Sequence, residues 1–217
     1  MLQLLNKSGN LVIVLHEIYG INQHMESFCH LLSKQNFDVI CPNLLEREHP
    51  FDYSEEKTAY HNFMENVGIS KAVHKIKNLL IDIKNDYQKI FIIGFSVGAT
   101  VAWLCSEEDG LDGVVAYYGS RIRNYEQIVP LCPTILFFPQ EEQSFNVDEL
   151  ISILDKKNVE IHKFNGQHGF SDPFSTKFNE KSYKSAYNEM LNFLKRHEKS
   201  TANAMPFVVH IFKHFKE

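Results

Sequence analysis

The sequence contains few arginines and no excess of positive charge. Only four of its 217 residues are arginine, and 27 acidic residues outnumber 22 lysines and arginines, which gives a formal net charge of −5. A chain of this charge lacks the basic surface that attracts nucleic acid or an anionic membrane. The composition therefore predicts neither nucleic acid nor a membrane as a partner.

Cysteine is also scarce, and no two cysteines have the spacing of a redox or metal motif. The four are Cys29, Cys41, Cys105 and Cys132, and three of them lie in apolar stretches. Such residues behave as small buried hydrophobes in a reducing compartment. The chain has no apolar run of the ~18 residues that span a bilayer, and its first ten residues do not resemble a secretion signal. We therefore expect a cytoplasmic protein.

What the sequence does contain is a regular alternation of strand-like and helix-like segments. Short apolar runs are typical of strands buried on both faces, and apolar residues at helical spacing are typical of helices that cover a sheet. The expected strands are 11–16, 37–42, 89–94, 111–119, 133–139 and 159–165, and the expected helices are 23–36, 70–86, 99–108, 147–158 and 175–199. This order predicts an α/β fold, a mostly parallel sheet with helices on both faces, in a single domain of residues 1–217.

One serine stands between two glycines where a predicted strand ends. Gly94-Phe95-Ser96-Val97-Gly98 matches the pattern G-x-S-x-G, in which a tight turn from strand to helix presents a serine hydroxyl as a nucleophile. The small residues let strand and helix approach closely, and the helix N-terminus stabilises negative charge. A structural turn would also fit these residues, but the strand before them and the helix after them favour a nucleophile.

A serine nucleophile of this kind needs an acid and a base that follow it in the chain. His168, in the loop NGQHGFSDP, comes just after the strand at 159–165 and is the candidate base. The acid is expected in QEEQSFNVDEL, which offers Glu141, Glu142 and Asp148. A carboxylate there would hold the imidazole in the required tautomer. Asp148 fits better as a helix start, and spacing does not distinguish the two glutamates.

Two histidines have a spacing that suits metal ligands. His210 and His214 lie four residues apart in segment 198–217, which has the pattern of a C-terminal amphipathic helical extension. Two such histidines share one helix face, but the sequence suggests no third ligand. We interpret the pair as part of a solvated helix face, and we expect neither a metal ion nor a cofactor.

Several segments, taken in order, resemble one family. VIVLHEIYGINQH, FDVICPNLL, IGFSVGAT, VAYYG and NGQHGFSDP resemble successive segments of the dienelactone hydrolase family of the α/β-hydrolase superfamily. The resemblance runs over roughly residues 10 to 195. It implies an α/β-hydrolase-type sheet and a hydrolytic activity.

The resemblance also implies roles for individual residues. Ser96 is then the nucleophile and His168 the base, and the stretch FFPQEEQSF places the acid at Glu142, where the family usually has aspartate. The backbone amides of Ile18 and Val97 correspond to those that bind the oxyanion.

Substrate recognition is where the chain departs from the family pattern. Glu17 matches a glutamate that helps to activate the nucleophile in cysteine-bearing members, and here we expect it to line the pocket. Asp172 stands where the family has an arginine that holds a substrate carboxylate. Tyr60 and Phe63 lie in a segment that could form a lid over the pocket, or could pack in the core. These features favour a neutral or apolar ester.

The sequence therefore predicts a serine hydrolase that cleaves a small ester or lactone through an acyl-enzyme. A non-catalytic binding protein of the same fold and an acyltransferase are the alternatives. The first would lack a carboxylate that reaches His168, and the second would pass the acyl group to another acceptor. The expected partner is a small molecule, and the chain is expected to be a monomer or a homodimer.

Overall fold

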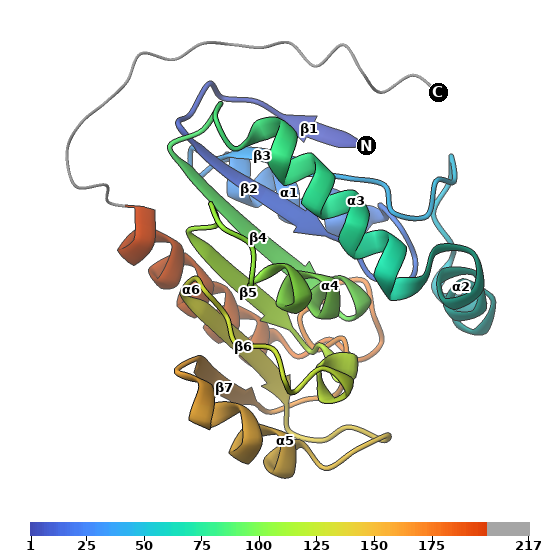
Figure 1. Cartoon of the computed structure of the whole chain (residues 1–217). Coiled ribbons are helices and arrows are strands. Elements are labelled where there is room, and N and C mark those ends of the chain that lie inside the picture. The colour runs from blue at the N-terminus through green and yellow to red at the C-terminus, as the bar shows by residue number, and fades with distance from the viewer. Residues whose placement is uncertain (199–217) are drawn as a thin grey trace.

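The computed structural model describes residues 1–198, which build a seven-stranded sheet in the order β1-β3-β2-β4-β5-β6-β7 (Figure 1). Neighbouring strands are parallel, except that β1 pairs antiparallel with β3. The strands are β1 (Leu2–Leu4), β2 (Asn10–Leu15), β3 (Asp38–Cys41), β4 (Lys89–Phe95), β5 (Gly113–Tyr117), β6 (Thr134–Pro139) and β7 (Glu160–Phe164). The mostly parallel sheet predicted from the alternation is thereby confirmed.

Helices cover both faces of this sheet (Figure 1). On β2, Leu11, Ile13 and Leu15 join one core cluster and Val12 and Val14 join another, because successive strand residues point to opposite faces. Helices α2, α3 and α4 contribute to the first cluster, and α1 and α6 to the second. Helix α5 packs with α4 against β5 and β6. The helices are α1 (Gln23–Ser33), α2 (Glu56–Asn62), α3 (Gly68–Ile83), α4 (Val97–Cys105), α5 (Val147–Leu154) and α6 (Glu180–Glu198).

Three elements differ from the sequence prediction. Strand β1, with three residues, pairs with β3 at one edge of the sheet, where the sequence predicted no strand. The segment between β3 and α3 forms α2 and then a π-helical turn, Phe63–Val67, where the sequence predicted no helix. Helix α6 begins at Glu180 rather than at 175, because the side chain of Asn179 accepts a hydrogen bond from the Ser182 N–H and starts the helix there.

Other expectations concern burial and the end of the chain. All four cysteines are free and buried, as expected of small hydrophobic side chains. Among residues 1–198, no helix is both long enough and apolar enough to cross a bilayer. Of the extension expected at 198–217, all but Glu198 lies outside the described residues, and so do His210 and His214.

Candidate active site

Ser96 stands on the turn between β4 and α4, at the carboxyl edge of the sheet. Its φ is +53°, a conformation that costs a residue with a side chain about 1–3 kcal/mol. Two glycines permit this turn, because a Cβ on Gly94 would lie 2.2 Å from the Gly98 carbonyl oxygen and one on Gly98 would lie 2.3 Å from that of Leu15. The Ser96 N–H donates to the Tyr117 carbonyl at 2.9 Å. The turn is thus hydrogen-bonded to the end of β5 on one side of β4 and lies close to the end of β2 on the other.

His168 lies beside this serine, in the loop that follows β7. The distance from its Nε2 to Ser96 Oγ is 2.8 Å, which is a hydrogen bond. The ring of Tyr118 packs against the imidazole, with the two ring centroids 5.0 Å apart. The imidazole is about one third exposed (30%), so that it faces both the serine and the solvent-accessible space in front of it.

Glu142 reaches the other ring nitrogen of this histidine. Its Oε1 lies 2.6 Å from His168 Nδ1, and its side chain is only 7% exposed. A β-bridge pairs the backbone of Glu142 with that of Phe145 within the loop after β6. This pairing fixes the position of the Glu142 backbone, from which the side chain extends. Ser96, His168 and Glu142 therefore form one continuous chain of hydrogen bonds.

The other two candidate acids lie elsewhere. Asp148 is in the first turn of α5, as its sequence position suggested, and its Oδ1 lies 2.5 Å from Lys163 Nζ. Glu141 is exposed and lines a neighbouring cavity. Of the three carboxylates that the sequence offered, Glu142 is the one bonded to the imidazole.

Ile18 and Val97, whose amides are the expected oxyanion donors, come from the loop after β2 and from the first residue of α4. The backbone of α4 approaches this loop closely, since a Cβ on Gly98 would lie 2.3 Å from the Leu15 oxygen and 2.7 Å from the His16 oxygen. The absence of a side chain at Gly98 thus brings the start of α4 against the end of β2. Val97 directly precedes Gly98 in α4, and Ile18 follows His16 by two residues, so both expected donors lie close in sequence to this contact.

His16 holds the peptide group that precedes Ile18. Its Nε2 accepts a hydrogen bond from the Leu44 N–H at 2.9 Å, so its proton is on Nδ1, which donates to the Glu17 carbonyl at 2.6 Å. Burial lowers the pKa of His16 to about 4 and keeps the ring neutral. The Glu17 carbonyl and the Ile18 N–H belong to one planar peptide group, so fixing the first orients the second.

A cavity of about 70 Å³ lies in front of Ser96 and His168. A second cavity, of about 420 Å³, adjoins it and shares Glu56, His168 and Lys177 with it. The smaller one is lined by Glu17, Ile18, Tyr19, Tyr53, Glu56, Ser96, His168, Gly169, Asp172, Ser175 and Lys177. The loop after β2, the segment before α2 and the loop after His168 therefore enclose the serine together.

Two expected pocket residues are placed differently. Phe63 is fully buried in the core cluster with α3 and α4, so the expectation that it lines the pocket is wrong and the alternative of core packing is correct. Its apolar ring is removed from water in this core cluster, which is more favourable than exposure at the wall of a polar cavity. Tyr60 is 40% exposed, hydrogen-bonded to the guanidinium of Arg121, and is not among the residues that line the cavity at Ser96. Tyr19 and Tyr53 supply the aromatic wall instead.

Buried acids dominate the electrostatics of the smaller cavity. Burial, together with the nearby Asp172, raises the pKa of Glu17 to about 7. Asp172 is also buried, and its Oδ2 accepts a hydrogen bond from Tyr53 at 2.5 Å. Burial lowers the pKa of His24, next to Asp172, to about 4, so its ring is neutral.

Tyr53 and Lys177 are among the residues of this cavity that were not found from the sequence. Tyr53 starts a turn before α2, and Lys177 lies between the His168 loop and α6. Neither belongs to a motif. The sequence offers only one weak signal for them: both residues lie in segments that follow the carboxyl ends of predicted strands.

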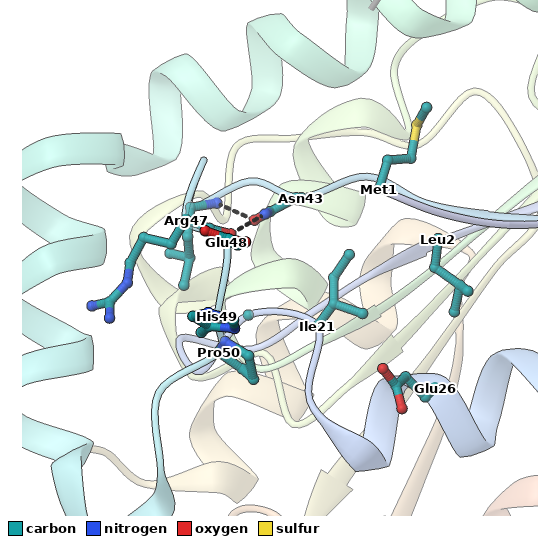
Figure 2. Close-up of a pocket in the computed structure, with 11 residues that line it drawn as sticks. Met1, Leu2, Ile21, Glu26, Asn43, Arg47, Glu48, His49 and Pro50 are labelled. Carbon is teal, nitrogen blue, oxygen red and sulfur yellow. Dashed lines mark hydrogen bonds between the residues drawn. The ribbon is translucent and has the colours of Figure 1, made fainter.

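A different cavity, of about 360 Å³, opens beside β1 (Figure 2). Residues 43–50 form one wall, where Asn43 Nδ2 donates to the Arg47 carbonyl at 2.6 Å, and Met1, Leu2 and Glu26 lie along the other. This cavity shares no residue with the one that contains Ser96. We therefore do not assign the hydrolytic site to it.

Known proteins are similar to this chain over most of its length. The model of the dienelactone hydrolase family matches residues 4–198. YczH of Bacillus subtilis (strain 168), described as an uncharacterized protein, is 44% identical over 172 residues, or 78% of this chain and 84% of YczH. Carboxymethylenebutenolidase 1 of Cupriavidus pinatubonensis is 20% identical over 189 residues, or 80% of each chain.

Solved structures share the fold. The dienelactone hydrolase-like promiscuous phosphotriesterase P91, from metagenomic libraries, has a TM-score of 0.67 with 15% identity, and the match covers 87% of this chain and 86% of P91. An identity this low shows the fold alone. The family match over residues 4–198 shows more: the protein belongs to the dienelactone hydrolase family, and it is a hydrolase with the α/β-hydrolase fold.

Proposed function

We propose that this protein is a serine hydrolase that cleaves small carboxylic esters or lactones through an acyl-enzyme. The observation that carries the proposal is the chain of hydrogen bonds from Ser96 Oγ through His168 to Glu142, at 2.8 and 2.6 Å. A nucleophile bonded to a base that a third group orients is the arrangement required for nucleophilic catalysis.

In the proposed mechanism, Ser96 Oγ attacks the ester carbonyl while His168 Nε2 takes its proton. The Nδ1–H of His168 donates to Glu142, whose negative charge stabilises the imidazolium that forms. The N–H groups of Ile18 and Val97 bind the oxyanion of the tetrahedral intermediate. His168 then protonates the leaving alcohol, and water repeats the sequence on the acyl-enzyme to release the acid.

A non-catalytic relative would be expected to lack a carboxylate that reaches His168. Glu142 is hydrogen-bonded to His168, and so the geometry favours an enzyme. Transfer of the acyl group to an acceptor other than water uses the same acyl-enzyme, and no observation in the described residues favours it. Hydrolysis is therefore the function that we propose.

A fluorophosphonate probe is expected to label the protein at one residue, Ser96. The probe reacts with serines whose hydroxyl an adjacent base activates, and it requires no knowledge of the substrate. Digestion and mass mapping of the labelled full-length chain locate the adduct. Absence of labelling in folded protein, or labelling at another serine, would contradict the proposal.

His16→Ala is expected to lower kcat by about 10- to 100-fold with little change in KM, because the Ile18 N–H loses its fixed direction; losing a whole oxyanion donor costs about 10²–10³. His16→Asn retains a donor near the Nδ1 position and is expected to recover part of the rate. Steady-state kinetics with a p-nitrophenyl ester measure both. His162→Ala is the control, since His162 lies on β7, stacked on Phe164. An equal fall in the control, or a change confined to KM, would show that His16 has only a structural role.

We expect uncharged short-chain esters to be better substrates than dicarboxylate lactones. The smaller cavity contains three carboxyl groups, on Glu17, Glu56 and Asp172, against one cation, Lys177. A substrate carboxylate would be repelled there, and burial weakens the screening. The test compares kcat/KM for a p-nitrophenyl ester and a dienelactone at pH 8, on enzyme dialysed against a chelator so that no stray cation alters the charge. An equal or higher value for the lactone would mean that Lys177 outweighs the acids, and Lys177→Met would then abolish the advantage.

A further inference from the structure

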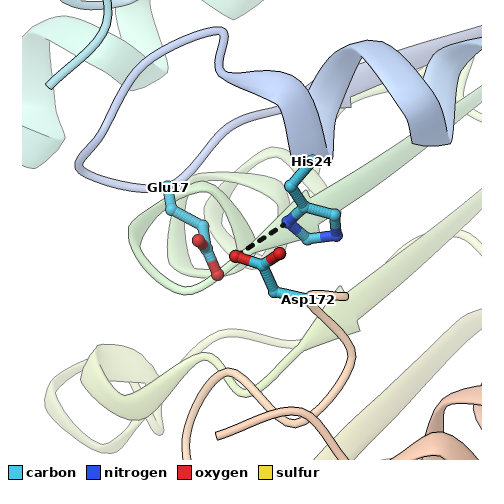
Figure 3. A group of neighbouring side chains, drawn as sticks. All are labelled: Glu17, His24 and Asp172. Atoms are coloured by element: carbon cyan, nitrogen blue, oxygen red, sulfur yellow. Dashed lines mark ion pairs between the residues drawn. The ribbon is translucent and has the colours of Figure 1, made fainter. Parts of the chain in front are cut away.

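Three side chains that can bind a metal ion, from distant parts of the chain, meet beside the candidate active site. Glu17 follows β2, His24 is in the first turn of α1, and Asp172 lies four residues after His168; Figure 3 shows their side chains converging. One ligand atom from each lies within 4.8 Å of the other two, and all three residues are buried. The catalytic mechanism proposed above uses none of them.

His24 is an unpartnered polar side chain in this cluster. It is 2% exposed, and neither ring nitrogen has a hydrogen-bond partner. Its Nδ1 points at Asp172, with 3.7 Å to Oδ2, which is too long for a hydrogen bond. The rings of Phe28 and Phe95 flank it, at centroid distances of 6.4 and 5.0 Å. Buried polar groups almost always have a bonding partner, so we expect the ring nitrogen of His24 that points at Asp172 to bind a ligand.

We propose that Glu17, His24 and Asp172 bind one divalent transition-metal ion of the Zn²⁺ class. A neutral imidazole and two carboxylates are a ligand set that such ions accept, whereas Ca²⁺ and Mg²⁺ prefer oxygen ligands alone. Metal–ligand bonds of about 2.0–2.2 Å place neighbouring ligand atoms roughly 3–4 Å apart. The three atoms need only a small inward movement to reach that spacing.

The surroundings of Asp172 support a ligand role. Tyr53 donates to its Oδ2 at 2.5 Å, and the Phe174 N–H donates to its Oδ1 at 2.9 Å. Asn22 in turn donates to the Tyr53 hydroxyl at 3.1 Å. Hydrogen bonds to a ligating carboxylate fix its orientation, and such outer partners commonly accompany metal ligands.

The position of the cluster gives the ion a consequence for substrates. Glu17 and Asp172 also line the cavity that contains Ser96, so an ion held between them would lie at the wall of that cavity. There the ion would bind an anionic oxygen of a substrate, such as a carboxylate. This consequence rests on the proposed hydrolase function, whereas metal binding itself does not.

The test is metal binding by the full-length, untagged protein after dialysis against a chelator. Calorimetric titration with Zn²⁺, and with Co²⁺ followed by visible absorption, is expected to show one equivalent bound. His24→Gln is expected to weaken binding by on the order of 100-fold or more, since even loss of an outer partner costs about 10- to 100-fold. Asp172→Asn is a second variant that weakens the same site and retains an oxygen that can accept the Tyr53 hydrogen bond.

Two controls separate this cluster from other histidines. His61→Ala removes a surface histidine that lies 3.4 Å from Glu65, and the double variant His210→Ala/His214→Ala removes the pair in the C-terminal segment. Both are expected to bind as the unchanged protein does. The proposal is overturned if the protein binds neither ion, if folded His24→Gln and Asp172→Asn bind normally, or if the tail variant abolishes binding. None of these readouts depends on esterase activity, so failure of the proposed function would leave them unaffected.

Discussion

Replacement of Ser96 by alanine is expected to reduce turnover of a p-nitrophenyl ester by about a thousandfold or more. The variant keeps the cavity and the amides of Ile18 and Val97, but it has no atom that can form the acyl-enzyme. His168→Ala is expected to lose a similar factor, because Ser96 Oγ then has no base at 2.8 Å. Initial rates with excess substrate measure both losses as kcat.

The double variant provides the stricter test of the same prediction. Residues that act as one unit are strongly non-additive, so Ser96→Ala/His168→Ala is expected to be little worse than either single variant. Ser175→Ala is the matched control, since Ser175 lines the same cavity. If the kcat losses of the two single variants multiplied in the double variant, or if the control lost a comparable factor, Ser96 and His168 would not act together.

Glu142→Gln is expected to lower turnover by on the order of a thousandfold, because an uncharged amide neither fixes the tautomer of His168 nor stabilises its imidazolium. The fold is expected to persist, since the substitution keeps the shape of the side chain and the bridge between residues 142 and 145 involves the backbone. The fall is expected in kcat more than in KM. Circular dichroism and thermal melting verify that the variant is folded.

The two neighbouring carboxylates give matched controls for this prediction. Asp148→Asn removes the ion pair with Lys163, and Glu141→Gln changes an exposed side chain. Both are expected to retain nearly full activity, since neither group is bonded to the imidazole. If Asp148→Asn were the damaging change and Glu142→Gln silent, the assignment of the acid would be refuted.

Local patterns were enough to predict most of the sheet. The runs LVIVL and KIFIIG are apolar on both faces, so their burial between two helix layers could be read directly. Strand β1 could not be predicted in this way, because three residues are too few to show a hydrophobic period. Their conformation depends on pairing with β3. The helical segment from Glu56 to Val67 is rich in polar residues, and burial of Ala59 and Phe63 becomes evident only once α3 is in place.

The candidate site was predictable to the extent that it lies in motifs. Ser96 and His168 sit in short segments with recognisable turns. The choice between Glu141 and Glu142 depends on the loop's backbone, which a bridge to Phe145 sets, and spacing does not encode it. His24 and Asp172 are separated by most of the chain, so their meeting follows only from the fold.

The backbone of Ser96 also bears on why the residue is there. At a φ of +53°, glycine would fold with less strain than any residue with a side chain. A chain selected for stability alone would therefore place a third glycine between Gly94 and Gly98. Serine at this position lowers the stability of the fold, and what it adds over glycine is a hydroxyl group. This indicates that the residue was selected for the chemistry of its hydroxyl.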